Sequence, residues 1–310
     1  MARQLPGTGE TFLDHLGHFV SDMEEAHRAL SRLGFTQTPY TVHRTAPTLG
    51  AEPVASGTAN RCVMFHEGYL EVLSVVDAAQ PIGARTQAQL DRYIGVHIVA
   101  MSDPDALARR DRLAAAGFHP EAPVNLRRPV PLAEADGHDE GEAMAAFTVC
   151  RTPANDMPEG RVQILSHHTE GAVWQPRWLE HENGVIGLRD VVILPVDLEE
   201  AIDRYTRFTE TAPRRVAEDL IRFPLGRGGV VLSTAARAAA LFPGATVPPI
   251  PGVVGYGLIS DGLAATRSFL AGRGFAISDA GPGLIGLALP SSIGGAWLVA
   301  EHERAFPWME

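Results

Sequence analysis

The sequence predicts an α+β fold built from four copies of one βαβββ module. Three segments carry the repeat most clearly, at residues 15–35, 97–118 and 256–275. Each is a short apolar run, followed by Ser-Asp, a helix-forming stretch rich in Ala, Leu and Arg, and a closing Gly-Phe. A weaker copy at 191–208 keeps this order without the Gly-Phe. Because self-similarity along a chain indicates one supersecondary unit used repeatedly, the four copies predict four similar modules.

Each part of the module has a physical basis. The apolar runs are short and aliphatic or β-branched, as strands are. An Asp precedes each expected helix, at positions 22, 103, 197 and 261, where its carboxylate can accept from the first free N–H groups. Leu and Ala at helical spacing supply one buried stripe. Gly34, Gly117 and Gly274 stand where a helix ends in a left-handed residue.

The segments after the expected helices separate this fold from other α/β arrangements. A doubly wound fold would continue with one strand and another helix. Here each helix is followed by strand-like runs broken by Gly and Pro, such as residues 36–44, 59–66 and 69–76, and by no convincing second helix. The unit is therefore a strand, a helix and about three further strands.

Length and composition limit the function. The 310 residues suggest about two domains, and all 26 basic residues are Arg, so a Schiff-base lysine, covalent pyridoxal phosphate and a Lys-bearing phosphate loop are excluded. A net charge of −11 disfavours nucleic acid as a partner. Two Cys make no disulfide framework, and we see no signal-peptide or membrane-spanning segment. We therefore expect a cytoplasmic protein with a small-molecule substrate, and a homodimer stays open.

The interruption of the pattern around Trp174 and Trp178 divides the chain. We expect a first domain at 1–172, a linker at 173–184 and a second domain at 185–310. The acidic segment at 132–142 is expected to form a long solvated loop within the first domain.

Four modules paired two and two resemble the vicinal oxygen chelate superfamily, which includes glyoxalases, extradiol dioxygenases and antibiotic-resistance proteins. Within it the chain looks most like the glyoxalase-like domain proteins, on residues 13–22, 57–65, 68–75 and 178–185. The resemblance is strongest over the first 185 residues or so. It implies that each pair of modules folds into an incomplete barrel, and that one such cup surrounds a divalent metal.

The resemblance also implies the metal ligands, which come from the first and last strands of each module. By position they are His15 and Glu71 in the first module, and His97 and Gln163 in the second. Independently, Glu71 lies in the apolar run Tyr-Leu-Glu-Val-Leu, where an unpaired carboxylate costs several kcal/mol. Two imidazoles and one carboxylate suit Zn(II), Mn(II), Ni(II), Co(II) or Fe(II) and leave positions open for substrate oxygens.

Three alternatives remain at these positions. Gln163 is neutral where the family often has Glu, so it could lie behind the ligands instead of among them. His18 competes with His15, although the two point to opposite faces of a strand. His97 lies six residues before Asp103, whereas His15 lies seven residues before Asp22. The equivalent position in the second module is therefore uncertain by one residue.

Further residues are candidates for the pocket. Asn60 and Arg61 could hold a polar substrate group, and His167 could line the cup. His181 and Asn183 belong to the family-like segment before the second domain. The last two modules lack His and Glu at the equivalent places, and their Gly226-Arg-Gly-Gly run, which has no Lys, is expected to be a turn.

The function expected from these features is a metal-dependent lyase or isomerase. The metal would chelate adjacent oxygens of a small substrate, and Glu71 or a metal-bound water would move the proton. One alternative is a ring-cleaving dioxygenase that holds Fe(II) with the same ligands. Another is a non-catalytic protein that binds or sequesters a small molecule. No organic cofactor is expected.

Overall fold

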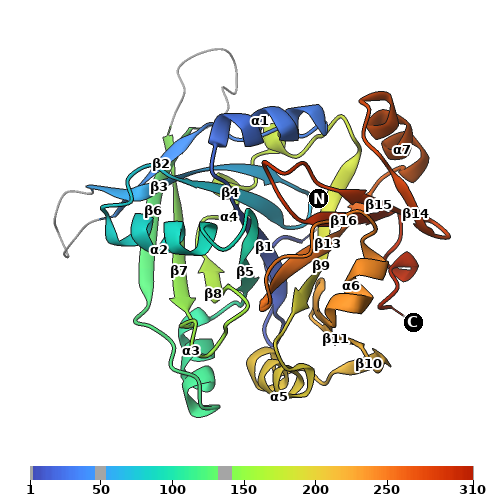
Figure 1. The fold of residues 1–310 in the computed structure, drawn as a ribbon. Helices are drawn as coiled ribbons and strands as arrows, with labels where there is room; N and C mark the ends of the chain where they lie inside the picture. The colour runs from blue at the N-terminus through green and yellow to red at the C-terminus, as the bar shows by residue number, and fades with distance from the viewer. Residues whose placement is uncertain (1–2, 46–53, 132–141, 310) are drawn as a thin grey trace.

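The computed structural model describes residues 3–45, 54–131 and 142–309, and two eight-stranded sheets dominate it (Figure 1). The first sheet consists of β1 (Phe12–Phe19), β2 (Thr41–Thr45), β3 (Val54–Met64), β4 (Tyr69–Val75), β5 (Gly95–Ser102), β6 (Val124–Pro131), β7 (Glu142–Arg151) and β8 (Arg161–His167). The second consists of β9 (Val185–Leu194), β10 (Arg214–Ala217), β11 (Leu220–Pro224), β12 (Gly229–Ser233), β13 (Gly252–Ser260), β14 (Ser278–Gly281), β15 (Leu284–Ala288) and β16 (Ala296–Ala300). The helices are α1 (Met23–Arg32), α2 (Pro81–Leu90), α3 (Ala106–Ala115), α4 (Glu170–Val173), α5 (Leu198–Thr209), α6 (Ala235–Leu241) and α7 (Leu263–Gly272), with 3₁₀ turns at Pro176–Trp178 and Glu303–Ala305.

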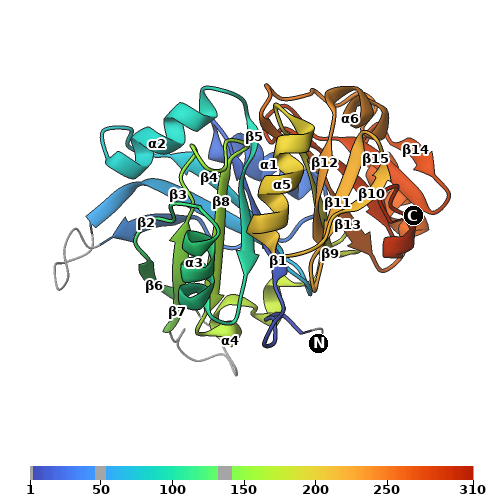
Figure 2. The same cartoon turned by 90° about the horizontal axis from the view of Figure 1, so that it is seen from below.

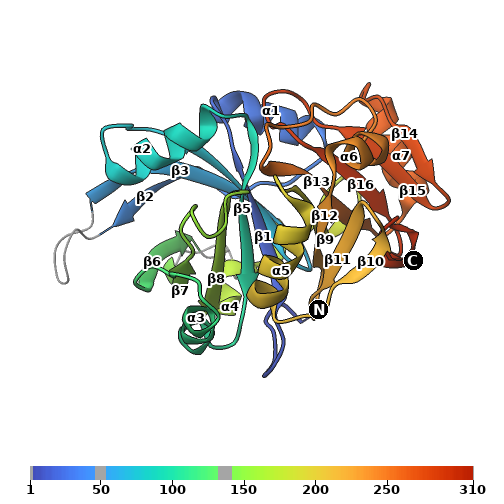
Figure 3. The ribbon, with the colours of Figure 1, turned by 60° about the horizontal axis from the view of Figure 1, so that its bottom comes forward.

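Both sheets have the same strand order, which confirms the predicted fold class. The first runs β2-β3-β4-β1-β5-β8-β7-β6 and the second β10-β11-β12-β9-β13-β16-β15-β14. In each, two βαβββ modules join through their first strands, β1 with β5 and β9 with β13, which pair antiparallel. Figure 3 shows the first sheet curled like a horseshoe, so that its inner face forms a cup. We call the inner faces of the two sheets the first cup and the second cup.

Most of the expected helix signals hold, with two corrections at the N-termini. Asp22 and Asp197 cap their helices as predicted. The cap of α3 is Asp105, whereas Asp103 lies two residues earlier and accepts from the Asp105 N–H. Gly262, not Asp261, precedes α7 and makes no side-chain cap.

The glycines expected at helix ends have left-handed backbones, with φ of +87°, +88° and +81° at Gly34, Gly117 and Gly274.

Two helices were missing from the sequence-based module. Helices α2 and α6 each follow the last strand of a module, where no second helix was expected. Helix α2 buries only the small residues Gly83 and Thr86, and α6 is a seven-residue, Ala-rich helix. Neither has the apolar stripe from which amphipathic helices are recognised. No helix in the described part of the chain is long and apolar enough to cross a membrane.

The outer faces of the two sheets pack toward each other through one shared core. Residues from both halves contribute, such as Leu16, Val99, Val191 and Tyr256. Figures 2 and 3 show α5 between the sheets, and its Tyr205 and Phe208 are fully buried in this core. The connection from β8 to β9, which includes the expected linker, contains α4 and the first 3₁₀ turn. The expected acidic loop at 132–141 lies outside the described residues.

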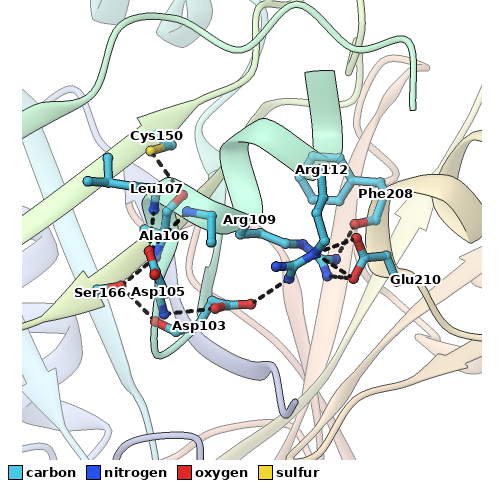
Figure 4. Close-up of polar contacts among 11 residues, drawn as sticks. Asp103, Asp105, Ala106, Leu107, Arg109, Arg112, Cys150, Ser166, Phe208 and Glu210 are labelled. Atoms are coloured by element: carbon cyan, nitrogen blue, oxygen red, sulfur yellow. Dashed lines mark hydrogen bonds and ion pairs between the residues drawn. The ribbon is translucent and has the colours of Figure 1, made fainter. Parts of the chain in front are cut away.

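A buried arginine joins the helices of the two halves (Figure 4). Arg109 on α3 donates to the carbonyl oxygen of Phe208 at the end of α5 and pairs with the Glu210 carboxylate. Arg112 also donates to Glu210, at 3.0 Å. The guanidinium of Arg109 thus satisfies a carbonyl at a helix C-terminus, where intrahelical donors run out.

Candidate functional site

A cavity of about 450 Å³ lies in the first cup. Its polar and charged lining residues are His15, Thr41, His43, Arg44, Ser56, Thr58, Glu71, Arg127, Arg151, Arg161 and Gln163. Its other lining residues are Val42, Tyr69, Leu73, Ile82, Ile98, Leu126, Phe147, Val149 and Leu165. A cavity of this size, with apolar walls and a few convergent polar groups, is typical of small-molecule sites.

The strand register places these polar residues in two adjacent rows. One row runs across β4, β1, β5, β8 and β7 through Tyr69, His15, Ala100, Gln163 and Arg151. The next row runs through Glu71, Gly17, Ile98 and Arg161. The expected residues His15, Glu71 and Gln163 are therefore brought together.

A β-bulge places a carboxylate behind His15. Leu13 pairs with Met101 and His15 with Ala100, so Asp14 is an extra residue in β1. Such bulges redirect a side chain, and here Asp14 Oδ1 lies 2.7 Å from Nδ1 of His15. The imidazole also stacks on Tyr69, with ring centroids 4.3 Å apart. With Nδ1 occupied, Nε2 is the ring nitrogen of His15 that is left for a ligand.

The second oxygen of Asp14 binds His167, so this carboxylate is held between two histidines. Asp14 Oδ2 lies 2.9 Å from Nε2 of His167, and both side chains are fully buried. His167 packs against Trp174 and the lining residue Phe147 without itself lining the cavity, so it lies beside the cavity on the same face of β8 as Gln163. Burial by itself would raise the pKa of Asp14, but His167 and His15 outweigh it and lower that pKa.

Glu71 is held by Asn60, which was expected to contact substrate. The Asn60 amide donates to Glu71 Oε1 at 2.6 Å, and Nε2 of His43 lies 3.9 Å from the same oxygen. Asn60 is buried and is not among the residues that line the cavity. It therefore positions the Glu71 carboxylate.

His97 does not join the other expected ligands. Ile98 pairs with Gly17 and Val96 with His18, so His97 is itself the extra residue of a bulge in β5. Its ring stacks between Phe19 and Tyr93, and Nε2 lies 2.8 Å from the Tyr93 carbonyl oxygen. Burial lowers the pKa of His97 to about 4. The one-residue ambiguity of register is thus resolved in favour of Ile98, which lines the cavity.

Three of the four expected ligands face the cup. His15, Glu71 and Gln163 supply one imidazole, one carboxylate and one neutral amide, and His43 adds a second imidazole to the lining. In the described part of the chain, no group of three or more His, Cys, Asp or Glu side chains could hold a metal ion. The expected set of His15, His97 and Glu71 is not brought together, because His97 is directed elsewhere.

The remaining candidates have structural partners away from the cavity. Arg61 donates to the Thr38 carbonyl oxygen and stacks over Tyr40. His181 lies 2.9 Å from the Met64 carbonyl oxygen, and Asn183 donates to the Leu33 carbonyl oxygen. His18 contacts the hydroxyl of Tyr256 in the second half, so it does point away from His15.

The run at Gly226 is a turn between β11 and β12, as expected. Leu225 N–H donates to the Gly228 carbonyl oxygen, and Gly228 has a φ of +68°.

The sequence interpretation missed Asp14, Arg151 and Arg161. Each is a charged residue within or at the end of a strand, and burial of such a charge requires a reason. The argument that singled out Glu71 applies equally to these three residues.

A family model for a glyoxalase-like domain matches residues 13–209, which cover the whole first cup together with β9 and α5. The chain belongs to the glyoxalase-like domain family. Three solved structures resemble this glyoxalase-like protein in fold. A hypothetical protein from Staphylococcus aureus is 10% identical, with a TM-score of 0.62 over 93% of this chain and 98% of that chain. A mutant of 4-hydroxymandelate synthase from Streptomyces coelicolor is 14% identical, with a TM-score of 0.56 over 96% and 94%.

The third is a fusion of a xylose isomerase-like TIM barrel with a 4-hydroxyphenylpyruvate dioxygenase. It is 13% identical, with a TM-score of 0.55, and the match covers 98% of this chain and 50% of that chain. No curated protein matches the sequence. At these identities the likeness to the solved structures shows the fold alone.

Proposed function

We propose that the first cup is the active site of a small-molecule isomerase or lyase in which His15 moves a proton. The observation that carries this proposal is the 2.7 Å contact between Asp14 and His15 Nδ1 beside an open cavity. A carboxylate behind a histidine fixes the ring and places the proton on the bonded nitrogen. The opposite nitrogen, Nε2, then has a lone pair with which to act as a general base.

Two neighbouring side chains complete the chemistry. Glu71, expected from sequence as the proton carrier, lines the same cavity and is a second group that can exchange a proton with substrate. Gln163 lies between His15 and Arg151 in their row, with only the small Ala100 separating it from His15. Its amide can donate to an oxygen that becomes negative as the proton leaves.

The rival functions are supported less well. Metal-dependent chemistry and Fe(II) ring cleavage both use the ligand set that lacks His97 here, so no step is assigned to a metal. A non-catalytic binding cup would have no use for Asp14, since burial of a carboxylate costs several kcal/mol before it is paired. The Asp14–His15 pair therefore favours catalysis.

The test is proton exchange in D₂O, followed by ¹H NMR, with a panel of 2-oxo and 2-hydroxy acids. For at least one compound we expect catalysed loss of a proton signal, that of the C3 hydrogens in a 2-oxo acid or of the C2 hydrogen in a 2-hydroxy acid. The loss should occur with or without a chelator. His15→Gln should abolish the exchange, whereas His119→Gln, at an exposed histidine, should not. Exchange that persists in His15→Gln, or that is absent for every compound, would contradict the proposal.

A further inference from the structure

Two arginines on neighbouring strands share one end of the first cup and take no part in the proton transfer. Arg151 ends β7 and faces Gln163 across the β7–β8 pair, and Arg161 begins β8 two residues before Gln163. Both line the cavity. Their positions follow from the register of two adjacent strands.

The positive charge of this pair is only partly balanced. Glu71 acts on both arginines through space, and neither forms an ion pair with a carboxylate within the described residues. Arg161 donates to Gln89 Oε1 at 3.4 Å and lies over the Phe19 ring. The other charges that act on Arg151 are Glu121 and Arg85, which lie within 4.0 Å of each other and cancel. Two guanidinium groups and one carboxylate leave one positive charge.

This excess charge is unfavourable in the absence of a ligand. Burial lowers the pKa of both guanidinium groups, and burial together with the charge of Arg151 lowers that of Arg161 to about 10. The chain as a whole carries a net charge of −11, so the charge of this cavity is opposite in sign to that of the whole chain. Arg44 and Arg127 at the exposed part of the lining extend the same sign outward, which attracts anions toward the cavity.

The rest of the lining is apolar and partly aromatic. Phe147, Val149 and Leu165 lie on the same two strands as the arginines, and Ile98 and Leu73 continue the wall. An anion that fits these walls carries its charge at one end and an apolar body at the other.

We propose that Arg151 and Arg161 anchor the carboxylate of a monoanionic substrate whose aryl or branched alkyl body lies against Phe147 and Leu165. One negative charge neutralises the excess, and a guanidinium matches the two oxygens of a carboxylate. The inference rests on the proposed function in that it assigns the substrate class of the same cup. The carboxylate lies where β7 ends and β8 begins, and the body extends along these two strands, on the face of β8 that carries Gln163, the neighbour of His15 in its row.

Isothermal titration calorimetry with three probes tests this assignment: 3-phenylpropanoate, its neutral amide and phenyl phosphate. We expect the acid to bind and the amide to bind at least tenfold more weakly. Arg151→Gln and Arg161→Gln should each weaken binding of the acid tenfold or more and leave the amide unchanged. Arg28→Gln, at an exposed arginine of α1, is the matched control and should change neither.

Equal affinity for acid and amide, or unchanged binding in both variants, would overturn the proposal, as would the absence of binding by the acid. Tighter binding of phenyl phosphate would overturn the monoanion assignment. The acid and amide are compared on the unmodified protein, so the test survives a variant that fails to fold. His15→Gln should still bind 3-phenylpropanoate although it loses proton exchange. The proposed function and the proposed anchoring can therefore fail independently of each other.

Discussion

The two cups share one strand order but differ in what fills them. The first contains a cavity lined by His15, Glu71 and the two arginines. The second is filled by the chain itself, because α6 and the C-terminal segment cover its inner face (Figure 1). Phe242, Phe306 and Trp308 pack there against strands of the second sheet.

Glycines on β13 make this filling possible. A Cβ on Gly255 would lie 2.8 Å from the Phe242 ring, and one on Gly257 would lie 2.9 Å from the Phe306 ring. In the first sheet, β5 carries Ile98 and Ala100 in the rows that cross the cup. The comparison shows that one fold gives a site or a solid core, depending on whether its own aromatic residues enter the cup.

The largest expected effect of a single substitution comes from opening the second cup. Trp308 is 1% exposed and stacks on Phe306 with ring centroids 5.2 Å apart. Trp308→Ala should lower the free energy of unfolding by about 3–5 kcal/mol, because it leaves a void in a packed core. Phe147→Ala in the first cup should cost about 1–2 kcal/mol, because this ring already borders a cavity. Equal losses in urea denaturation would show that both cups are filled alike.

Acid should act on the first half more strongly than on the second. Burial lowers the pKa of His18, His97 and His181 to about 4, whereas residues 185–310 contain a single histidine, His302. The unfolded chain binds these protons near pH 6.5, so the stability present above that pH falls as the pH drops toward 4. The loss is about 3 kcal/mol for each histidine. Hydrogen exchange measured between pH 7 and 4 should show the first sheet opening first, and uniform loss of protection would contradict this.

The junction between the halves gives the next effect. Arg109→Met removes the cation that pairs with Glu210 and the donor to the Phe208 carbonyl oxygen. We expect a loss of about 3 kcal/mol in urea denaturation, as when one partner of a buried pair is removed. Arg110→Met is the control, since Arg110 pairs with the exposed Asp111 and should cost at most about 1 kcal/mol. Similar losses in the two variants would contradict a special role for Arg109.

The smallest effect is expected at Gly257, whose missing side chain leaves room for the Phe306 ring. Gly257→Ala places a methyl group against that ring and should cost about 1–3 kcal/mol by overpacking. Gly171→Ala is the control, because its Cβ would meet nothing within 4 Å. Thermal melting of both variants checks this, and an unchanged melting temperature for Gly257→Ala would show that the second cup can relax.

The module was predictable because its signals are local. Apolar runs, capping Asp22 and Asp197 and left-handed Gly34 each act within a few residues. Helices α2 and α6 lack an apolar stripe, so their helical state was not apparent from periodicity.

The site was predictable only in part, because bulges decide it. His15, Glu71 and Gln163, which the resemblance implied, all line the cavity, whereas Asp14 and His97 each occupy an extra position that alternation along a strand does not foresee. One bulge brings Asp14 behind His15, and the other directs His97 away from the cup.

The most direct test of the central claim is ¹⁵N NMR of the histidine side chains with 3-phenylpropanoate as the probe. We expect His15 to carry its proton on Nδ1, toward Asp14, and its Nε2 resonance to shift when the acid is added. Asp14→Asn should change the protonation pattern of His15, and His302 in the second half should not respond. A proton on Nε2 of His15 in the unmodified protein, or no response of His15 to the acid, would contradict the claim.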